Sequence, residues 1–211
     1  RVIFPIRDHL GRVVGFGGRV LDDSLPKYLN SPETPIFHKS AQLYGLFEAN
    51  RAYRDLHSVV LVEGYMDVIG LYEHDLRCAV ATLGTAVSTS HFQRVFRYTD
   101  RVVCCFDGDN AGRQAAWRAL EASLTCLNEK NSICFLLLPE GDDPDSLIAK
   151  EGKAAFVTRL QQAMPLSDFL LSHVSSQHRL GSLDGKARFI QALAPILAKL
   201  RDDVLRGMLI E

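Results

Sequence analysis

The chain has 211 residues, of which 47% are hydrophobic and 23% charged, a composition typical of soluble globular proteins that bury a sizeable core. The net charge of −1 gives no general attraction to nucleic acid, and no apolar run approaches the ~20 residues of a transmembrane helix, which argues against a membrane protein. Five cysteines without a C-x-x-C spacing argue against a disulfide framework and against a zinc site, and they favour a cytoplasmic protein.

Residues 1–57 are predicted to form a mixed α+β subdomain with a slight excess of positive charge, eight Lys and Arg against six Asp and Glu. Residues 2–6 and 12–20 have extended patterns separated by a short turn, which predicts a β-hairpin. Residues 26–35 are rich in Pro, Asn and Ser and predict a loop, and a helix is expected over about 41–54. Because the chain opens directly in an extended pattern and ends within a helical one, we expect it to be a piece of a longer protein.

Residues 58–150 alternate between short apolar runs and segments of helical length. The apolar runs are 59–62, 78–81, 102–106 and 133–138, and the expected helices are 66–73, 88–98 and 111–126. Nearly continuous apolar strands that alternate with helices indicate a parallel sheet covered on both faces. We therefore predict a doubly wound, mostly parallel α/β domain over 58–150.

Residues 151–211 are predicted to form a helical subdomain in which strands no longer occur. Helical spacing of apolar residues extends over 153–163, 166–174 and 184–206. Pro195 lies inside the last of these patterns and is expected to kink or divide the helix.

Three of the four predicted strands are followed by acidic residues. They are Glu63 and Asp67, Asp107 and Asp109, and Asp142, Asp143 and Asp145. Ligands of open parallel sheets bind beyond the carboxyl ends of the strands. Residues two apart in extended chain point to the same side, so we expect Asp107 and Asp109 to aim at one ion or at two adjacent ions. Asp143 and Asp145 are expected to repeat this arrangement, with Pro144 stiffening the turn.

Carboxylates gathered in this way repel one another unless cations neutralise them. Mg²⁺ typically uses a few carboxylates together with substrate phosphates, and the expected helix start near Ala111 would attract phosphate. Two ions ~3.5–4 Å apart would suit phosphoryl transfer. A single Asp-Gly-Asp is often only a turn, but three acidic clusters on one sheet favour a metal site. The histidines show no ligand spacing, and a lone one such as His38 or His91 is expected to be a surface or core residue.

The acidic motifs resemble the TOPRIM signature, and the flanking motifs resemble bacterial DnaG-type primases. The TOPRIM-like strings are E-G-Y-M-D at 63–67, D-G-D-N-A-G-R at 107–113 and D-D-P-D at 142–145. The primase-like strings are F-P-I-R-D at 4–8, G-F-G-G-R at 15–19, P-K-Y-L-N-S-P-E-T at 26–34, I-F-H-K at 36–39 and L-Y-G-L at 43–46. The resemblance runs over essentially the whole chain and implies a DNA-dependent RNA polymerase that makes short RNA primers from ribonucleoside triphosphates on single-stranded DNA during replication.

The resemblance also implies roles for particular residues. Glu63, Asp107, Asp109 and Asp145 match the catalytic and metal positions, Asp143 is expected beside them as a metal ligand, and Asp67 as a supporting acid. Arg19, Lys27, Asn30 and Lys39 fall on the nucleotide- and DNA-facing surface. The implied cofactor is Mg²⁺, with Mn²⁺ as a substitute and two ions in the site. The family's zinc-binding domain, the first part of the polymerase subdomain and the helicase-binding domain are expected to lie outside this chain, so the replicative helicase would bind elsewhere.

Several alternatives stay open at the level of the residues. Lys27 and Lys39 also fit ordinary surface lysines. The glycines of 15–18 leave room either for nucleic acid or for a packed neighbour, and Tyr28, Tyr44 and Phe47 suit either base stacking or core packing.

Rival functions exist at the level of the whole site. A topoisomerase or nuclease would share the acidic fold, and a phosphoacceptor signalling module also gathers aspartates at strand ends. Glu63 suits either a metal ligand or the base that accepts the proton of a 3′-hydroxyl.

Overall fold

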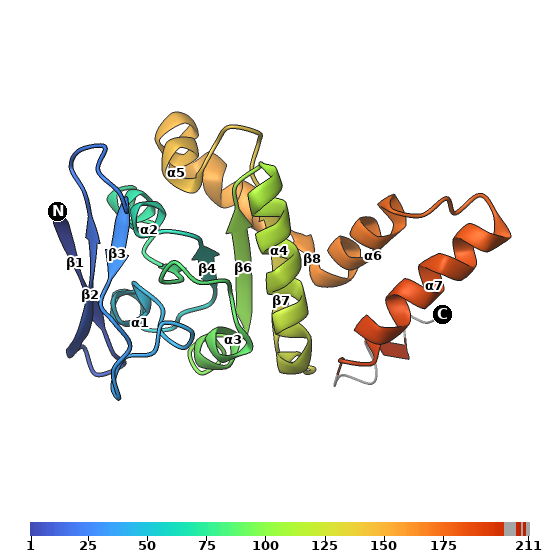
Figure 1. Ribbon diagram of the computed structural model, residues 1–211, viewed down its shortest axis with the longest axis horizontal. Coiled ribbons are helices and arrows are strands. Elements are labelled where there is room, and N and C mark those ends of the chain that lie inside the picture. Colours follow the sequence, from blue (N-terminus) through green and yellow to red (C-terminus); the bar gives the residue numbers. More distant parts are fainter. Residues whose placement is uncertain (201–205, 208, 210–211) are drawn as a thin grey trace.

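A computed structural model describes residues 1–200, 206, 207 and 209 of the chain. Figure 1 shows three parts in sequence order: a small antiparallel sheet at the N-terminus, a larger sheet flanked by helices, and two helices that project from the far edge of that sheet. No helix among the described residues is both long and apolar enough to cross a membrane.

The N-terminal sheet contains the predicted hairpin and one further strand. Strands β1 (Val2–Arg7) and β2 (Val13–Arg19) pair antiparallel, which confirms the hairpin. Strand β3 (Tyr28–Asn30) pairs with β2 inside the segment predicted as a loop. Helix α1 (Leu46–Ala52) starts later than predicted, because the backbone of Tyr44 pairs with that of Ala81.

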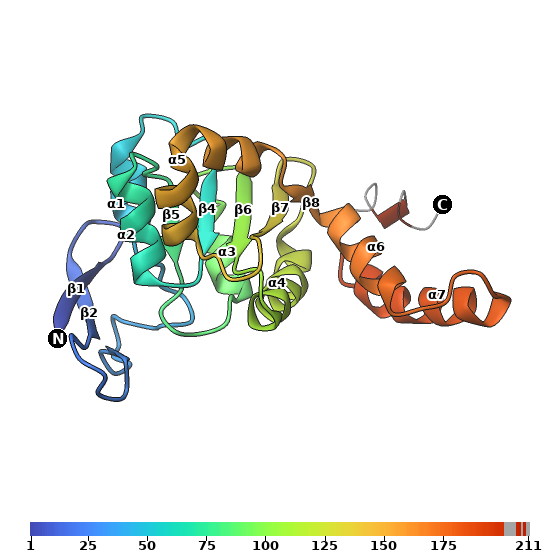
Figure 2. The same ribbon diagram turned by 90° about the horizontal axis from the view of Figure 1, so that it is seen from above.

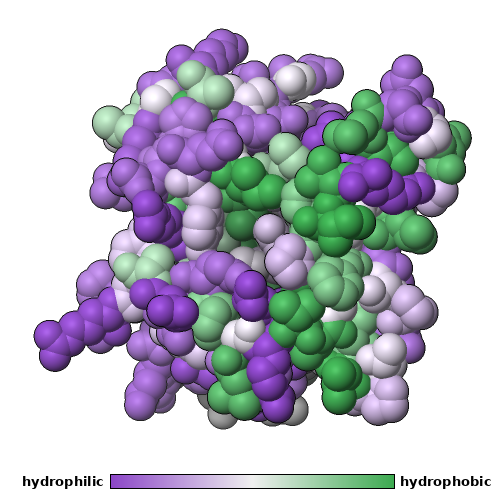
Figure 3. Space-filling view, turned by 90° about the vertical axis from the view of Figure 1, so that its left-hand side faces the viewer, coloured by the Kyte–Doolittle hydropathy of each residue, from purple (hydrophilic) through white to green (hydrophobic). Residues whose placement is uncertain are grey.

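The two faces of the N-terminal sheet differ in their surroundings. Phe4 and Ile6 point inward and join Phe37, Tyr65 and Leu83 in a small core. A Cβ atom on Gly17 would lie 2.6 Å from the ring of Tyr65, so the glycine-rich strand is packed against a neighbour. On the outer face, apolar side chains such as Ile3, Phe16 and Leu29 are at least half exposed, and Figure 3 shows hydrophobic surface gathered on this side of the molecule.

The larger sheet has the predicted parallel strands, in the order β5-β4-β6-β7-β8. Its bounds are β4 (Val59–Val62), β5 (Ala79–Ala81), β6 (Arg101–Phe106), β7 (Ser132–Leu137) and β8 (Met164–Pro165). The covering helices are α2 (Tyr65–Glu73), α3 (Thr89–Val95), α4 (Asn110–Ser123) with a 3₁₀ turn (Leu124–Cys126), and α5 (Pro144–Gln161). Helices α2 and α5 cover one face and α3 and α4 the other (Figure 2). This confirms the doubly wound α/β architecture.

Of two predictions near residue 150, one was wrong and the other agrees with the structure. Strands do not end there, because β8 pairs antiparallel with β7. The helix expected over 153–163 matches the second part of α5, whose first part is capped by Asp143 and begins at Pro144. Gly152, with a φ of 81°, breaks the helical geometry within α5. The predicted division at residue 150 therefore lies two residues before this break in α5.

The C-terminal part consists of α6 (Leu166–Ser176) and α7 (Leu183–Leu197). Both helices match predicted ones, although α7 ends two residues after Pro195, and residues 201–205 of the predicted helix lie outside the described part of the chain. Aromatic stacking holds α6 on the sheet and on α4. The ring centroids of Phe169 and Phe135 of β7 are 4.4 Å apart, and those of His173 and Trp117 of α4 are 4.2 Å apart.

Candidate active site

The predicted acidic residues meet where the sheet changes its direction of winding. Strands β4 and β6 are parallel neighbours, and the chain proceeds outward from β4 to β5 before it crosses back to β6. Glu63 directly follows β4 and Asp107 directly follows β6. Their positions agree with the rule that ligands of such sheets bind outside the carboxyl ends of strands at this switch point.

The carboxyl groups at this edge are close enough to perturb one another. Burial raises the pKa of Glu63, and the charges of Asp107 and Asp109 raise it further. Burial also raises the pKa of Asp107, with added repulsion from Asp143 and Asp109. Among the described residues, no basic side chain forms an ion pair with Glu63 or Asp107, so these two carboxylates have no direct neutralising partner.

Asp67, on the first turn of α2, belongs to the same network. Burial raises its pKa to about 7, and the carboxylates of Asp107, Asp143 and Glu63 act in the same direction. One hydrogen bond opposes the shift, from the Gly64 amide to the Asp67 carboxylate at 2.9 Å. The structure therefore brings together five of the six predicted acids as one electrostatic group, and the sixth, Asp145, is coupled to it through the charge of Asp143.

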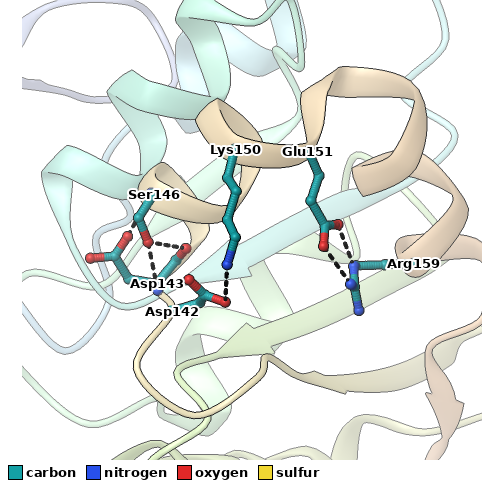
Figure 4. Close-up of polar contacts among 6 residues, drawn as sticks. All are labelled: Asp142, Asp143, Ser146, Lys150, Glu151 and Arg159. Atoms are coloured by element: carbon teal, nitrogen blue, oxygen red, sulfur yellow. Dashed lines mark hydrogen bonds and ion pairs between the residues drawn. The ribbon is translucent and has the colours of Figure 1, made fainter.

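Two of these carboxylates also start helices. Asp109 accepts a hydrogen bond from the amide of Gly112 at 2.7 Å at the beginning of α4. Asp143 accepts one from the amide of Ser146 at 2.7 Å, and the Ser146 hydroxyl accepts one from the Asp143 amide at 3.0 Å (Figure 4). These bonds fix the two side chains, and the Asp-Pro-x-Ser spacing that indicates such a start is visible in the sequence.

Asp145 is placed differently from the prediction. It lies in the first turn of α5 rather than in extended chain, so Asp143 and Asp145 do not point to the same side. Asp145 packs on α2, because a Cβ atom at Gly70 would overlap its carboxylate. Burial and then the charges of Asp143 and Glu73 raise the pKa of Asp145, whereas His74 and Arg19 lower it.

The remaining acid of the third cluster, Asp142, has a basic partner. Its carboxylate lies 3.7 Å from the Lys150 ammonium, as Figure 4 shows. Further along α5 the guanidinium of Arg159 binds Glu151 through two hydrogen bonds of 2.6 and 2.7 Å. Asp142 and Glu151 therefore each have a basic partner, unlike the carboxylates that lack one.

The donor set fits a hard divalent cation in its chemistry. It offers only carboxylate oxygens, and their mutual repulsion is what such an ion would relieve. In the described part of the chain, however, no three carboxylate, imidazole or thiol side chains are arranged so that they could hold a metal ion. Asp109 and Asp143 each use Oδ1 to accept from a helix amide, which leaves Oδ2 of each carboxylate for an ion.

The predicted basic surface lies on the N-terminal sheet and the loop that follows it. The Arg19 guanidinium lies 5.6 Å from the centre of the Tyr28 ring and is near enough to Asp145 to lower its pKa. Lys27 is exposed and Lys39 is half-buried. The side chain of Asn30 accepts from the Tyr65 hydroxyl at 2.5 Å and donates to the Leu83 carbonyl at 2.7 Å. Asn30 thus joins the small sheet to the large one.

The three aromatic residues considered for base stacking differ in how far they are packed against neighbours. Tyr44 packs edge-on against Tyr65, with ring centroids 4.7 Å apart. Tyr28 stacks on Tyr65 at 6.3 Å and is partly exposed. Phe47 is half-buried beside Gly11.

Comparison with known proteins yields matches along the whole chain. Three family models match: "DNA primase catalytic core, N-terminal domain" at 1–50, "Toprim-like" at 60–148 and "DnaB-helicase binding domain of primase" at 167–211. The chain is 51% identical to the DNA primase of Escherichia coli (strain K12), over 98% of this chain and 36% of that protein. It is 53% identical to the DNA primase of Pseudomonas aeruginosa, over 98% of this chain and 31% of that protein. The chain therefore spans about a third of the curated relatives it matches.

Solved structures of primases also match the chain. A DnaG primase catalytic domain bound to single-stranded DNA superposes with a TM-score of 0.94 at 50% identity, covering 100% of this chain and 68% of that one. The zinc-binding and RNA polymerase domains of Aquifex aeolicus primase superpose with a TM-score of 0.82 at 34% identity, covering 99% and 49%.

The third family match corrects one expectation from the sequence. The helicase-binding domain was expected outside this chain, whereas a model with that description covers 167–211. These residues include α6 and α7, the helices that project from the sheet.

Proposed function

The chain belongs to the bacterial DnaG-type primase family, and we propose that it is the part of a primase that joins ribonucleotides into short RNA primers on a single-stranded DNA template. The observation that carries this proposal is the group of carboxylates at the switch point of the sheet, whose pKa values rise through burial and mutual repulsion. Such a group suits metal-assisted nucleotidyl transfer, because divalent cations held by the carboxylates would relieve their repulsion and neutralise the charge of a triphosphate.

Membership of this family implies the use of a divalent metal ion. We propose that the ion is Mg²⁺, with Mn²⁺ as a substitute, and that two ions are held by Glu63, Asp107, Asp109, Asp143 and Asp145, with Asp67 in support. When bound, such ions lower the pKa of an attacking hydroxyl and neutralise the charge on the leaving oxygen. Glu63 would either hold an ion or accept the proton of the 3′-hydroxyl, since both tasks require a carboxylate.

The proposed substrates are held by the basic surface. Arg19, Lys27 and Lys39 would contact the phosphates of the incoming nucleotide and of the template, because single strands are held largely through phosphate contacts. Asn30 would act at the same surface while it joins the two sheets. The proximity of Arg19 to Asp145 supports a substrate that reaches both the basic and the acidic groups. The product would be an RNA primer made in the cytoplasm, and α6 and α7 are proposed to contact the replicative helicase.

The test is single-turnover extension of a primed single-stranded oligonucleotide by the chain with Mg²⁺ or Mn²⁺. Glu63→Gln keeps the side-chain volume and removes the charge, so we expect the rate to fall by ~10²–10⁴-fold while the thermal midpoint stays near that of the wild type. Asp142→Asn is the matched control, because Asp142 is paired with Lys150, and its rate should stay within about twofold of the wild type.

Three results would contradict the proposal. The first is a Glu63→Gln rate within about fivefold of the wild type, well below the usual contribution of a general base. The second is an equal loss of rate in Asp142→Asn. The third is shortening of the DNA without release of pyrophosphate, which would favour the nuclease alternative.

A further inference from the structure

Helix α3 is fastened at its first turn to the segment that carries Lys39. The hydroxyl of Ser88, the residue that caps the helix, donates a hydrogen bond to the Ser40 carbonyl at 2.6 Å. One turn later, Nε2 of His91 lies 3.2 Å from the Lys39 carbonyl oxygen. The guanidinium of Arg94 adds a hydrogen bond to the side chain of Gln42. The helix therefore binds three nearby points of a segment about 50 residues earlier in the chain.

The hydrogen bonds of His91 define its tautomer. The Ser88 amide donates to Nδ1 at 3.1 Å, so Nδ1 carries a lone pair and the proton resides on Nε2. The Nε2 hydrogen then points at the Lys39 carbonyl. The side chain is fully buried, and burial lowers the pKa of the imidazole, which keeps it neutral. Both ring nitrogens of the buried His91 side chain are therefore used in hydrogen bonds, one with the Ser88 amide and one with the Lys39 carbonyl.

Lys39 is held by its backbone on both sides. Its amide donates to the carboxylate of Glu33 at 2.9 Å, and its carbonyl accepts from His91. Within the described residues, the Lys39 ammonium makes no hydrogen bond or ion pair. The peptide is fixed while the charge at the end of the side chain stays available, which lowers the ordering cost of a later contact with phosphate.

These contacts attach Lys39 to the body that carries the acidic group. Helix α3 packs on α4, which Asp109 caps, and the segment after Lys39 is bound to β5 through the pairing of Tyr44 with Ala81. Lys27 differs, because the hydrogen bond that its carbonyl accepts among the described residues comes from the amide of Val20, directly after β2. Lys39 is thus set relative to the large sheet, and Lys27 relative to the small one.

We propose that His91 is a positioning residue, which holds the Lys39 backbone so that its ammonium meets a phosphate of the nucleotide or template beside the acidic group. This inference rests on the proposed function, since it needs a phosphate that Lys39 contacts. Its consequence is that His91 acts on binding only through Lys39.

The experiment measures dissociation constants of the chain for fluorescein-labelled oligo(dT) and for a fluorescent ATP analogue with Mg²⁺. His91→Asn keeps an acceptor near the Nδ1 position for the Ser88 amide but removes the donor to Lys39. His91→Gln places an amide donor near the Nε2 position. Each variant is combined with Lys39→Ala, and with Lys27→Ala as the matched control, and thermal midpoints identify variants that do not fold.

We expect Lys39→Ala to weaken binding of at least one probe by about tenfold, which corresponds to ~1.4 kcal/mol. His91→Asn should weaken the same probe by about three- to fivefold, and His91→Gln should restore it to within about twofold of the wild type. In the Lys39→Ala background His91→Asn should add nothing, whereas in the Lys27→Ala background its effect should multiply, as independent effects do.

Two results would overturn the inference and can be told apart. If Lys39→Ala leaves both affinities unchanged, the proposed phosphate contact is absent, and the inference fails together with that part of the proposed function. If Lys39→Ala weakens binding but His91→Asn has no effect, or has the same effect in both backgrounds, His91 serves stability alone. If His91→Asn does not fold, His91→Gln is compared in the Lys39→Ala and Lys27→Ala backgrounds instead. An effect of His91→Gln on affinity that adds to the effect of Lys39→Ala would count against the inference.

Discussion

At the scale of single residues, Asp67 is where burial and charge repulsion act together. Its pKa in the folded protein is about 7, above the ordinary 3.8. As the pH rises, the unfolded chain therefore loses this proton at a lower pH than the folded protein does. The free energy of unfolding should therefore fall between about pH 4 and pH 7 through this group. Asp67→Asn removes the charge and keeps an acceptor for the Gly64 amide. We expect it to raise the thermal midpoint at pH 8 by about 2–6 °C, and by much less at pH 4.

The measurement is thermal unfolding of both proteins across this pH range in the presence of a chelator. Mn²⁺ added at pH 8 should raise the midpoint of the wild type, because a bound cation relieves the same repulsion. A midpoint for Asp67→Asn equal to that of the wild type at every pH would argue that Asp67 carries no unfavourable charge in the fold.

Individual side chains were predictable where a single rule fixes them. Glu63 and Asp107 could be placed because parallel strands end at a common edge. Asp143 and Asp145 could not be placed by an extended-chain rule, because Asp143 caps a helix that places Asp145 in its first turn. His91 was expected only as a surface or core residue. Its partner is a backbone carbonyl 52 residues away, and no local pattern indicates such a bond.

At the scale of secondary-structure elements, α2 and α5 meet at Gly70. Because a Cβ atom there would overlap the Asp145 carboxylate, Gly70→Ala should displace Asp145 from the acidic group. Alanine favours the helix by about 1 kcal/mol over glycine, so α2 itself should not be weakened. We expect extension by Gly70→Ala to slow at least tenfold and its Mn²⁺ affinity to drop, as measured by extension kinetics and metal titration.

Gly152→Ala serves as the control for the same substitution in the facing helix. No atom lies within 4 Å of a Cβ there, but the φ of 81° is strained for alanine. This variant should lose stability and keep its metal affinity. Equal Mn²⁺ affinity in Gly70→Ala and the wild type would show that α2 accommodates the methyl group without moving Asp145.

Helices and strands could be predicted from the sequence wherever the local pattern fits only one type of element. The four parallel strands are apolar except at the first residues of β6 and β7 and are bounded by helix-length segments, so strand and helix could be told apart. Strand β3 has three residues in a stretch rich in Pro, Asn and Ser, and it exists because β2 offers it a partner. The beginning of α1 is likewise set by tertiary pairing, between Tyr44 and Ala81.

At the scale of the whole molecule, the proposed reaction requires the small basic sheet and the acidic edge of the large sheet to hold a common orientation. A small apolar core joins them, to which Phe4 of β1 and Tyr65 of α2 both belong, with ring centroids 5.2 Å apart. Asn30 supplies the polar part of this junction through Tyr65 and Leu83. Composition gives no sign of the junction, because its partners are far apart in the sequence.

Tyr65→Phe tests whether this junction aligns the two charged surfaces. The substitution leaves the ring stacking intact and removes the hydroxyl that donates to Asn30 at 2.5 Å, so the amide oxygen of Asn30 loses its partner. A fully buried acceptor left without a partner costs about 1–3 kcal/mol. Asn30 is partly buried, so the cost here should be at the lower end of this range, and part of it should appear as misplacement of Arg19 and Lys27. We therefore expect the KM for nucleotide to rise about three- to tenfold, with Mn²⁺ affinity unchanged, because Tyr65 contributes nothing to the carboxylates.

Tyr44→Phe is the matched control for this experiment, since it removes a hydroxyl from the same aromatic cluster that makes no hydrogen bond among the described residues. It should leave the KM within about twofold of the wild type, as substitutions that disturb no such feature usually do. A rise in KM of the same size in both variants would assign the effect to general loosening of the aromatic core. An unchanged KM in Tyr65→Phe, with a lowered thermal midpoint, would mean that the junction stabilises the fold without aligning its two surfaces.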